Sequence, residues 1–376
     1  MKVCVIGLRG IPDVPGGIET HCENLYERIA PSTSAPEVIV IGRAPYIGRK
    51  AYKTHAGIEV VPAMALRNKY FETISNAFFA IFWARFKAHA DVVHIHAIGP
   101  GLLSWMARLL GMKVVLTHHG DDFNREKWNA VAKFALRLGE RIGVTNAART
   151  IAVSPSLAER LKQSYPGKAD AIRYVPNGAD HIVARAAAAD ASDVLARFGL
   201  KPQGYYIGVG RLVPEKGFAD LIRAHKAAQC KLPLVIVGGS SHSDHEQELS
   251  DLAHDGVTMT GSLPQAEVAQ LLSQCRLFVM PSTHEGLPIA ALEAWAMQAP
   301  MLLSDIQPNL DVGLPENHYF PTSDVEELTA RLRGDETGLK ALPFPAAFNW
   351  TSIAEETAEI YNSLDDAISL DKASAA

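Results

Sequence analysis

The chain has 376 residues, and 48% of them are hydrophobic, which is enough apolar material for two domains that each bury a core. Four scattered cysteines, without C-x-x-C pairs or metal-ligand spacing, are typical of a reduced, cytosolic protein. No secretory signal pattern opens the sequence, and no apolar run reaches the length of a membrane span. We therefore expect a cytoplasmic protein.

The net charge of −5 hides an asymmetry between the two halves of the chain. Residues 1–180 carry 23 Lys and Arg against 15 Asp and Glu, a net charge of +8, and the remainder carries 13 against 26, a net charge of −13. A basic first half indicates a domain that faces an anionic partner, such as a membrane surface. The alternative is that this difference in charge between the two halves has no function. The basic residues are dispersed and form no known nucleic-acid-binding motif, so we expect no nucleic-acid partner.

Strand-like and helix-like segments alternate along almost the whole chain. The first series of expected strands is KVCVIG, EVIVIG, DVVHIH, KVVLTHH and TIAVSP, and the second is YYIGVGR, LPLVIVGG, VTMTGS, LFVMPS and PMLLSD. Two such series predict an α/β protein with two doubly wound parallel sheets. Because the periodicity lapses around residues 177–192, we place the domains at 1–182 and 183–348, with a terminal segment at 349–376.

The loop after the first strand, GLRGIPDVPGGIET, contains a pair of glycines. Gly16 and Gly17 permit backbone conformations closed to other residues and let a ligand approach closely. The loop is longer than the dinucleotide-binding G-x-G-x-x-G pattern and contains two prolines, so it is not that fingerprint.

Residues 71–86 form the helical part of a segment that mixes aromatic residues with flanking cations. Two interpretations stay open. The helix lies on a membrane surface, or it is an ordinary buried helix of an α/β domain. We favour burial.

Histidines gather at the ends of two neighbouring strands of the first series. His94 and His96 share one strand face, and His96 lies nearer the carboxyl end. The next strand ends in His118 and His119, where an imidazole facing a ligand can donate or accept a hydrogen bond. The alternative is a metal site assembled from His94, His96, His118, His119, Asp121 and Asp122. We consider a metal the weaker interpretation, because the second domain already offers cations for an anionic ligand.

The second domain places cations and carboxylates on loops after two strands. Arg211 and Lys216 follow the first strand, where they suit a diphosphate. Glu285 follows the strand at residues 276–282, and Pro288 suits the first position of a helix that carries Glu293. Ligands of open α/β sheets bind at this edge. Two carboxylates beside an anion site favour a ligand that also presents hydroxyls, as a sugar nucleotide does.

The runs GRLVPEKG and EGLPIAALEA, in this order, resemble the retaining glycosyltransferases of family 4, which have the GT-B fold. The resemblance implies two Rossmann-like domains facing each other across a cleft, with a terminal helix that returns to the first domain. It assigns the donor's phosphates to Arg211 and Lys216, the donor sugar to Glu285 and the ribose to Glu293. The other implied donor-binding residues are Gly16, Gly17, Gly286 and Leu287.

The elements GLRGIP…GGIET and HGDD resemble a bacterial subgroup that includes rhamnosyltransferases of surface polysaccharides. By this resemblance His119 supports the transferring sugar from across the cleft. Weaker candidates on the acceptor or sugar side are His96, Asp122 and Glu19. Gln298 stands where the family commonly has Gly, which predicts a different end for the preceding helix.

The resemblance implies a retaining transfer from a nucleotide-sugar donor, a UDP- or GDP-sugar, to an acceptor hydroxyl. We expect no metal, since no Asp-x-Asp signature is present and the cations can neutralise the leaving diphosphate. The resemblance implies a lipid-linked saccharide of bacterial exopolysaccharide, capsule or O-antigen as the acceptor, at the inner face of the membrane. The alternatives are a GT-B sugar-nucleotide epimerase and a non-catalytic sugar-nucleotide-binding subunit.

Overall fold

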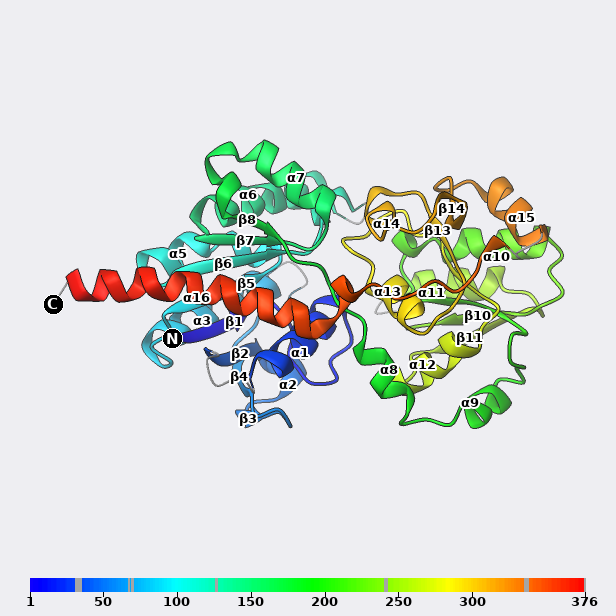
Figure 1. Cartoon of the computed structure of the whole chain (residues 1–376), viewed down its shortest axis with the longest axis horizontal. Helices are drawn as coiled ribbons and strands as arrows, with labels where there is room; N and C mark the ends of the chain where they lie inside the picture. Colours follow the sequence, from blue (N-terminus) through cyan, green and yellow to red (C-terminus); the bar gives the residue numbers. More distant parts are fainter. Residues whose placement is uncertain are drawn as a thin grey trace. The chain divides into compact units, whose positions relative to one another are not determined.

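The computed structural model describes residues 1–30, 36–66, 68, 71–125, 128–239, 243–334 and 338–374 (Figure 1). The last two residues of the expected terminal segment therefore lie outside the described chain. Contacts divide the protein into an N-terminal unit, residues 1–177 with 349–376, and a C-terminal unit, residues 178–348. The first division thus falls a few residues before the expected boundary at 182.

The N-terminal unit is built on a sheet of strand order β3-β4-β2-β1-β5-β6-β7-β8, in which only the β3–β4 pair is antiparallel. The strands are β1 (Lys2–Ile6), β2 (Glu37–Arg43), β3 (Tyr52–Lys53), β4 (Glu59–Ala63), β5 (Val92–His96), β6 (Lys113–His118), β7 (Arg149–Ala152) and β8 (Ile172–Tyr174). The helices are α1 (Gly17–Ile29), α2 (Ala44–Ile47), α3 (Glu72–Phe86), α4 (Ile98–Gly101), α5 (Ser104–Leu109), α6 (Ala130–Asn146), α7 (Pro155–Ser164), α16 (Trp350–Ser374) and the 3-10 turns η1 (Asp122–Asn124) and η2 (Pro166–Ala171).

The C-terminal unit has a wholly parallel sheet of order β11-β10-β9-β12-β13-β14. Its strands are β9 (Tyr206–Val209), β10 (Leu234–Val237), β11 (Val257–Gly261), β12 (Leu277–Met280), β13 (Met301–Ser304) and β14 (Tyr319–Phe320). Its helices are α8 (His181–Ala186), α9 (Ala191–Arg197), α10 (Phe218–Ala227), α11 (Ser243–Leu252), α12 (Gln265–Gln274), α13 (Ile289–Ala296), α14 (Gln307–Leu310), α15 (Val325–Arg333) and the 3-10 turns η3 (Pro214–Lys216), η4 (Glu316–His318) and η6 (Ala346–Phe348). The predicted pair of doubly wound parallel sheets is confirmed.

The strand order reverses once in each sheet. In the N-terminal unit β1 lies between β2 and β5, and in the C-terminal unit β9 lies between β10 and β12. The crossovers leave these strand pairs in opposite directions, and ligands of open α/β sheets bind in the crevice outside the carboxyl ends of such strands. The loops after β1 and β5, and those after β9 and β12, are therefore the places to look for a site.

The terminal helix α16 belongs to the N-terminal unit. It packs against α1 (Figure 1). Trp350, Ile353 and Tyr361 are buried in the same core as Cys22 and Tyr26 of α1. The apolar residues of α16 thus recur on the side that covers α1, as expected for an amphipathic helix against a core.

Helix α3 is only partly buried, which corrects the favoured interpretation of residues 71–86. Its small residues, such as Ala77 and Ala80, face the core. Phe78, Phe82 and Phe86 are 42%, 38% and 58% exposed. Their rings follow one another at i, i+4 spacing, with centroids 5.0 and 5.9 Å apart. The helix is apolar on both sides, so composition alone did not show which side is covered. Within the described residues, no helix combines the length and apolar character needed to cross a bilayer.

The end of α13 corrects a second expectation. Gln298 adopts the positive φ, 59°, that glycine usually supplies after a helix, and its backbone N–H donates to the carbonyl of Trp295. The side-chain amide also donates to the carbonyl of Leu342 at 3.3 Å. The left-handed helix end is therefore kept without a glycine.

Candidate functional site

The loops after β9 and β12 are locked together at the point where the second sheet reverses. Gly217 has a φ of 68°, and a Cβ there would lie 2.1 Å from the carbonyl oxygen of Pro281. The backbone N–H of Thr283 donates to the carbonyl of Glu215 at 2.9 Å. Only glycine permits both this conformation and this approach, so the two loops hold a fixed relative position.

Two of the predicted donor-binding residues meet across these loops. Lys216 Nζ lies 2.6 Å from Glu285 Oε1, and the two side chains are 15% and 11% exposed. The stem of Lys216 runs close to Gly210, where a Cβ would lie 3.2 Å from its Cε. Arg211 is exposed on the same loop. A cation and a carboxylate thus stand together at the crevice, partly open to solvent.

The second carboxylate, Glu293, lies against a buried histidine. It is buried on α13, and its Oε1 lies 3.1 Å from His181 Nε2, a ring that is 3% exposed. Sequence reasoning missed His181, the first residue of α8. The only local indication was a new helix directly after PNGAD.

The segment between the two glutamates differs slightly from the prediction. Helix α13 begins at Ile289, so Pro288 occupies the cap position rather than the first helical position. Its φ of −74° and ψ of 101° are extended, which turns the chain into the helix. Gly286 is half-buried and Leu287 is buried in the loop just before it.

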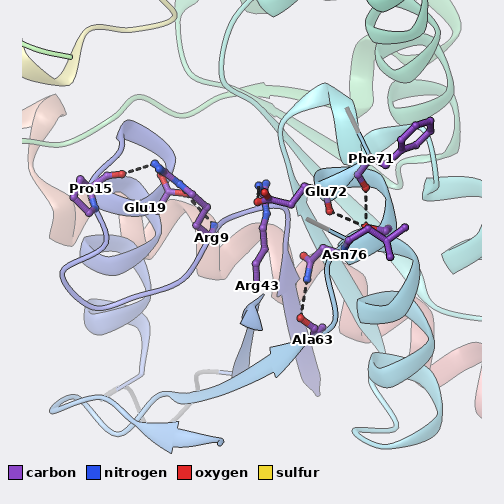
Figure 2. Close-up of polar contacts among 10 residues, drawn as sticks. Arg9, Pro15, Glu19, Arg43, Ala63, Phe71, Glu72 and Asn76 are labelled. Atoms are coloured by element: carbon purple, nitrogen blue, oxygen red, sulfur yellow. Dashed lines mark hydrogen bonds and ion pairs between the residues drawn. The ribbon is translucent and has the colours of Figure 1, made fainter. Parts of the chain in front are cut away.

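The glycine loop after β1 is closed by an ion pair (Figure 2). Arg9 Nε lies 3.0 Å from Glu19 Oε1, and the backbone N–H of Arg9 donates to the same oxygen at 3.0 Å. Nη2 of the same guanidinium donates to the carbonyl of Pro15. Gly16 has a φ of 151°, and a Cβ there would lie 2.1 Å from Glu19 Oε2, whereas a Cβ on Gly17 would meet nothing within 4 Å. Glu19 therefore fixes the loop, and of the two adjacent glycines Gly16 requires the absence of a side chain, whereas Gly17 does not.

Figure 2 also shows how the start of α3 is tied to the sheet. Arg43 at the end of β2 donates to Glu72 Oε1 at 2.8 Å, and both side chains are largely buried. Asn76 donates to the carbonyl of Ala63 at the end of β4. These bonds orient α3 and hold its phenylalanines outward.

His96 and His119 lie at the ends of β5 and β6 and contact each other. His96 Nδ1 is 2.9 Å from His119 Nε2. His96 Nε2 is 2.8 Å from the hydroxyl of Tyr26, which leads to Tyr361 and His94 in the core. Burial and the neighbouring histidines lower the pKa of both His96 and His119 well below the ordinary value, so both rings are neutral at pH 7.

His118 turns away from His119 and joins a different network. Its Nε2 is 2.9 Å from Glu140 Oε2, and Arg160 lies 2.7 Å from the same oxygen and 2.6 Å from Asp121 Oδ1. Although burial raises it, hydrogen bonds from His118 and Arg160 lower the pKa of Glu140 to about 2. Asp122 pairs instead with Arg125 at 3.2 Å.

The six-residue metal site considered from the sequence is therefore not assembled. Both nitrogens of His94 are bonded inside the core, Nδ1 to the hydroxyl of Tyr361 and Nε2 to Thr117. Asp121 and His118 face Arg160 and Glu140. Adjacent strand ends do approach each other, but alternate side chains point to opposite faces of the sheet.

Comparisons with known proteins cover both units. Residues 15–182 match the family described as "Glycosyltransferase Family 4", and residues 197–333 match "Glycosyl transferases group 1". The alpha-maltose-1-phosphate synthase of Mycolicibacterium smegmatis is 30% identical over 315 residues, which span 72% of this chain and 79% of that protein. The chain belongs to glycosyltransferase family 4.

Two further similar proteins support the assignment of this chain to the glycosyltransferases. The GDP-mannose:cellobiosyl-diphosphopolyprenol alpha-mannosyltransferase of Xanthomonas oryzae is 25% identical over 321 residues, 82% of this chain and 80% of that protein. The sucrose-phosphate synthase of Thermosynechococcus elongatus has the same fold, with a TM-score of 0.83, 21% identity and coverage of 97% and 99% of the two chains. Sugar transfer on a GT-B fold, expected from the motifs, is thereby confirmed.

In this transferase the predicted residues form one group in each unit. Lys216 and Glu285 meet in the C-terminal unit, with Arg211 on the same loop. His96 and His119 meet in the N-terminal unit, whereas Glu19 is engaged by Arg9 and Asp122 by Arg125. Their roles in binding stay predictions, as does the relationship to rhamnosyltransferases.

Proposed function

We propose that the protein transfers a sugar from a UDP- or GDP-sugar to an acceptor hydroxyl with retention of configuration. The observation that carries this proposal is the Lys216–Glu285 pair at the strand-order reversal of the C-terminal unit. A nucleotide sugar presents both an anion and hydroxyls, and this pair offers a donor for the first and an acceptor for the second.

The diphosphate is proposed to bind Lys216 and Arg211. An ammonium group has three N–H donors, so a single contact with Glu285 leaves others for phosphate oxygens. Negative charge grows on the diphosphate as the sugar departs, and a preorganised cation stabilises that charge. These two cations supply this stabilisation, so we propose that catalysis requires no metal.

The two carboxylates are proposed to divide the hydroxyls of the donor. Glu285, at the mouth of the crevice, accepts from the sugar, and Glu293 accepts from the ribose. The contact with His181 involves one oxygen of Glu293, so the carboxylate keeps acceptor sites for the ribose hydroxyls. His181 is a positioning residue in this scheme, because it fixes the rotamer of Glu293 from the buried side.

His119 is proposed to hydrogen-bond the transferring sugar as a neutral imidazole. For retention, a nucleophile on the opposite face of the sugar is one route, and no residue of the motifs supplies it. We propose instead front-face attack, in which the leaving phosphate accepts the proton of the acceptor hydroxyl. The new glycosidic bond forms as the bond to the phosphate breaks.

The acceptor is proposed to be a lipid-linked saccharide of a bacterial polysaccharide. The Xanthomonas relative uses GDP-mannose and a diphosphopolyprenol-linked acceptor, according to its name. The phenylalanine row of α3, Phe78, Phe82 and Phe86, lies in the unit with the positive net charge. Aromatic side chains with cations such as Arg85 and Lys87 beside them suit the interface of an anionic membrane.

The test is an assay of a panel of UDP- and GDP-sugars with saccharide–lipid acceptors, with and without EDTA. We expect one donor to release its nucleoside diphosphate only when acceptor is present, insensitively to EDTA, and NMR of the product to show the donor's anomeric configuration. Conversion of a donor without acceptor would indicate an epimerase. Binding of a donor without any turnover would indicate a non-catalytic subunit.

A further inference from the structure

Three imidazoles from three different elements converge in the N-terminal unit. They are His21 on α1, His96 at the end of β5 and His119 just after β6. The ring centroids lie 5.4 Å (His21–His96), 4.9 Å (His21–His119) and 5.2 Å (His96–His119) apart. One ring nitrogen of each residue lies within 4.8 Å of one nitrogen of the other two. None of the expectations from sequence included His21 in a site.

The ring of His21 directs a lone pair toward this point. Its Nδ1 lies 2.9 Å from Asn177 Oδ1, an acceptor, so Nδ1 carries the proton and Nε2 does not. Nε2 is buried and has no hydrogen-bond partner within the described residues. Trp350 packs edge-on against the ring at 5.4 Å and helps to hold it. A buried acceptor without a donor is costly, so this nitrogen calls for an explanation.

His96 is held in the same manner by its outer nitrogen. If His96 Nε2–H donates to the hydroxyl of Tyr26, that hydroxyl donates its own proton to Tyr361 or to His94 Nδ1, which lies 2.9 Å away, and the hydroxyl of Tyr361 donates to His94 Nδ1. His94 Nε2 then donates to Thr117. This orientation leaves a lone pair on His96 Nδ1, the atom that faces His119.

We propose that His21, His96 and His119 form a binding site for a divalent transition metal of the zinc type. Three imidazole nitrogens with an open fourth position suit zinc and cobalt. The ligating atoms are Nε2 of His21, Nδ1 of His96 and Nε2 of His119. Each ring keeps one proton on its outer nitrogen, so neutral rings bind the metal with a change of tautomer and no net loss of protons.

The surroundings supply outer contacts for two of the three proposed ligands, His21 and His96. Such a histidine almost always donates its other N–H to an oxygen, and here His21 donates to Asn177 and His96 to Tyr26. The neighbouring group of His118, Asp121 and Glu140 differs, because the guanidinium of Arg160 already lies against both carboxylates. We therefore propose no metal at that group.

The consequence for the enzyme is inhibition. A metal occupies the nitrogen of His119 and withdraws the ring from the sugar, so zinc should slow transfer. This consequence rests on the proposed role of His119, whereas metal binding itself does not.

The test is a titration of the full chain, free of any polyhistidine tag and treated with chelator, with Co²⁺. We expect one Co²⁺ per chain, with the visible absorption of a cobalt ion bound by nitrogen, and its displacement by Zn²⁺. His21→Gln should weaken binding at least tenfold, and Asn177→Ala about 10- to 100-fold through the lost outer contact. The Asn177 variant keeps all three ligands. It therefore tests the site even if circular dichroism shows that His21→Gln is unfolded.

The matched control is His225→Gln, because His225 is equally buried and contacts another imidazole, His254, at 3.2 Å. It should leave the cobalt titration unchanged. The proposal is wrong if the wild type binds neither ion. It is equally wrong if the His225 change abolishes binding while the His21 and Asn177 changes do not. These readouts need no donor or acceptor, so their outcome is independent of the transferase assay.

Discussion

At the scale of the residue, burial decides which side chains are available to a ligand. Glu19 and Asp122 were candidates by motif, yet each faces a guanidinium of its own loop, Arg9 and Arg125. His181 and His21 were absent from every motif, yet each lies against a candidate or within a cluster. A motif reports the residue type at a position, whereas the partner of that side chain depends on the tertiary structure.

His181 gives the first prediction at this scale. His181→Ala should raise the Michaelis constant for the donor about tenfold, about 1.4 kcal/mol, because Glu293 loses its fixed rotamer. The turnover number should change much less, since the sugar contacts remain. His181→Gln, whose side-chain amide can donate to the carboxylate, should restore most of the affinity. Steady-state kinetics with varied donor measures both constants. Equal effects of the Ala and Gln variants would contradict the positioning role.

Glu140 gives a prediction for the dependence of stability on pH. Its pKa is about 2 in the folded protein against 4.5 in the unfolded chain. The carboxylate therefore contributes stability above pH 4.5, of order 3 kcal/mol, which is lost as the pH falls from about 4.5 to 2. Urea denaturation across this range should show a shallower pH dependence for Glu140→Gln than for the wild type. Parallel curves would mean that Glu140 is not responsible.

At the scale of the element, the strands that frame the crevices were the most predictable. β1, β9 and β12 are continuous apolar runs that end in Gly, Pro or Ser, as expected for buried parallel strands. The short strands β3, β8 and β14 were missed, and β4 contains Pro62, which weakens a strand pattern. Lys216 meets Glu285 because β9 lies beside β12 in the sheet. The order of strands in a sheet cannot be predicted from local sequence patterns.

Gly217 allows a test of how these elements hold the crevice. Gly217→Ala should destabilise the protein by at least about 2 kcal/mol, because alanine disfavours positive φ and its Cβ would meet Pro281. Gly167→Ala, at an exposed position where a Cβ would meet nothing within 4 Å, is the matched control and should have little effect. Chemical denaturation measures both free energies. A neutral Gly217→Ala would show that the two loops are not locked.

At the scale of the whole molecule, charge and exposed apolar surface divide unequally between the units. Unit-wide charge was readable from composition, but the exposed phenylalanines of α3 were not, because the helix is apolar on both sides. Membrane association, if it occurs, should therefore depend on the N-terminal unit.

A vesicle experiment tests this dependence. Phe78→Ser/Phe82→Ser should lower the affinity for anionic phospholipid vesicles by about 10- to 100-fold, because full burial of a phenylalanine contributes about 1.5–3 kcal/mol and only about two-fifths of each side chain is still exposed. The control Val183→Ser/Leu310→Ser removes two exposed apolar side chains of the C-terminal unit, and should bind as the wild type does. Co-sedimentation measures the affinities. Equal binding of both double variants would place the membrane contact elsewhere.

The central claim is that the C-terminal unit binds the nucleotide of the donor through Lys216, Glu285 and Glu293. A thermal-shift panel of UDP, GDP, dTDP and ADP, with and without EDTA, tests it most directly. One nucleotide at about 100 times its dissociation constant should stabilise the wild type by about 2.7 kcal/mol. That shift should persist in EDTA and in Glu316→Ala, an exposed control, and be lost in Glu293→Ala. No shift from any nucleotide, or an undiminished shift in Glu293→Ala, would contradict the claim.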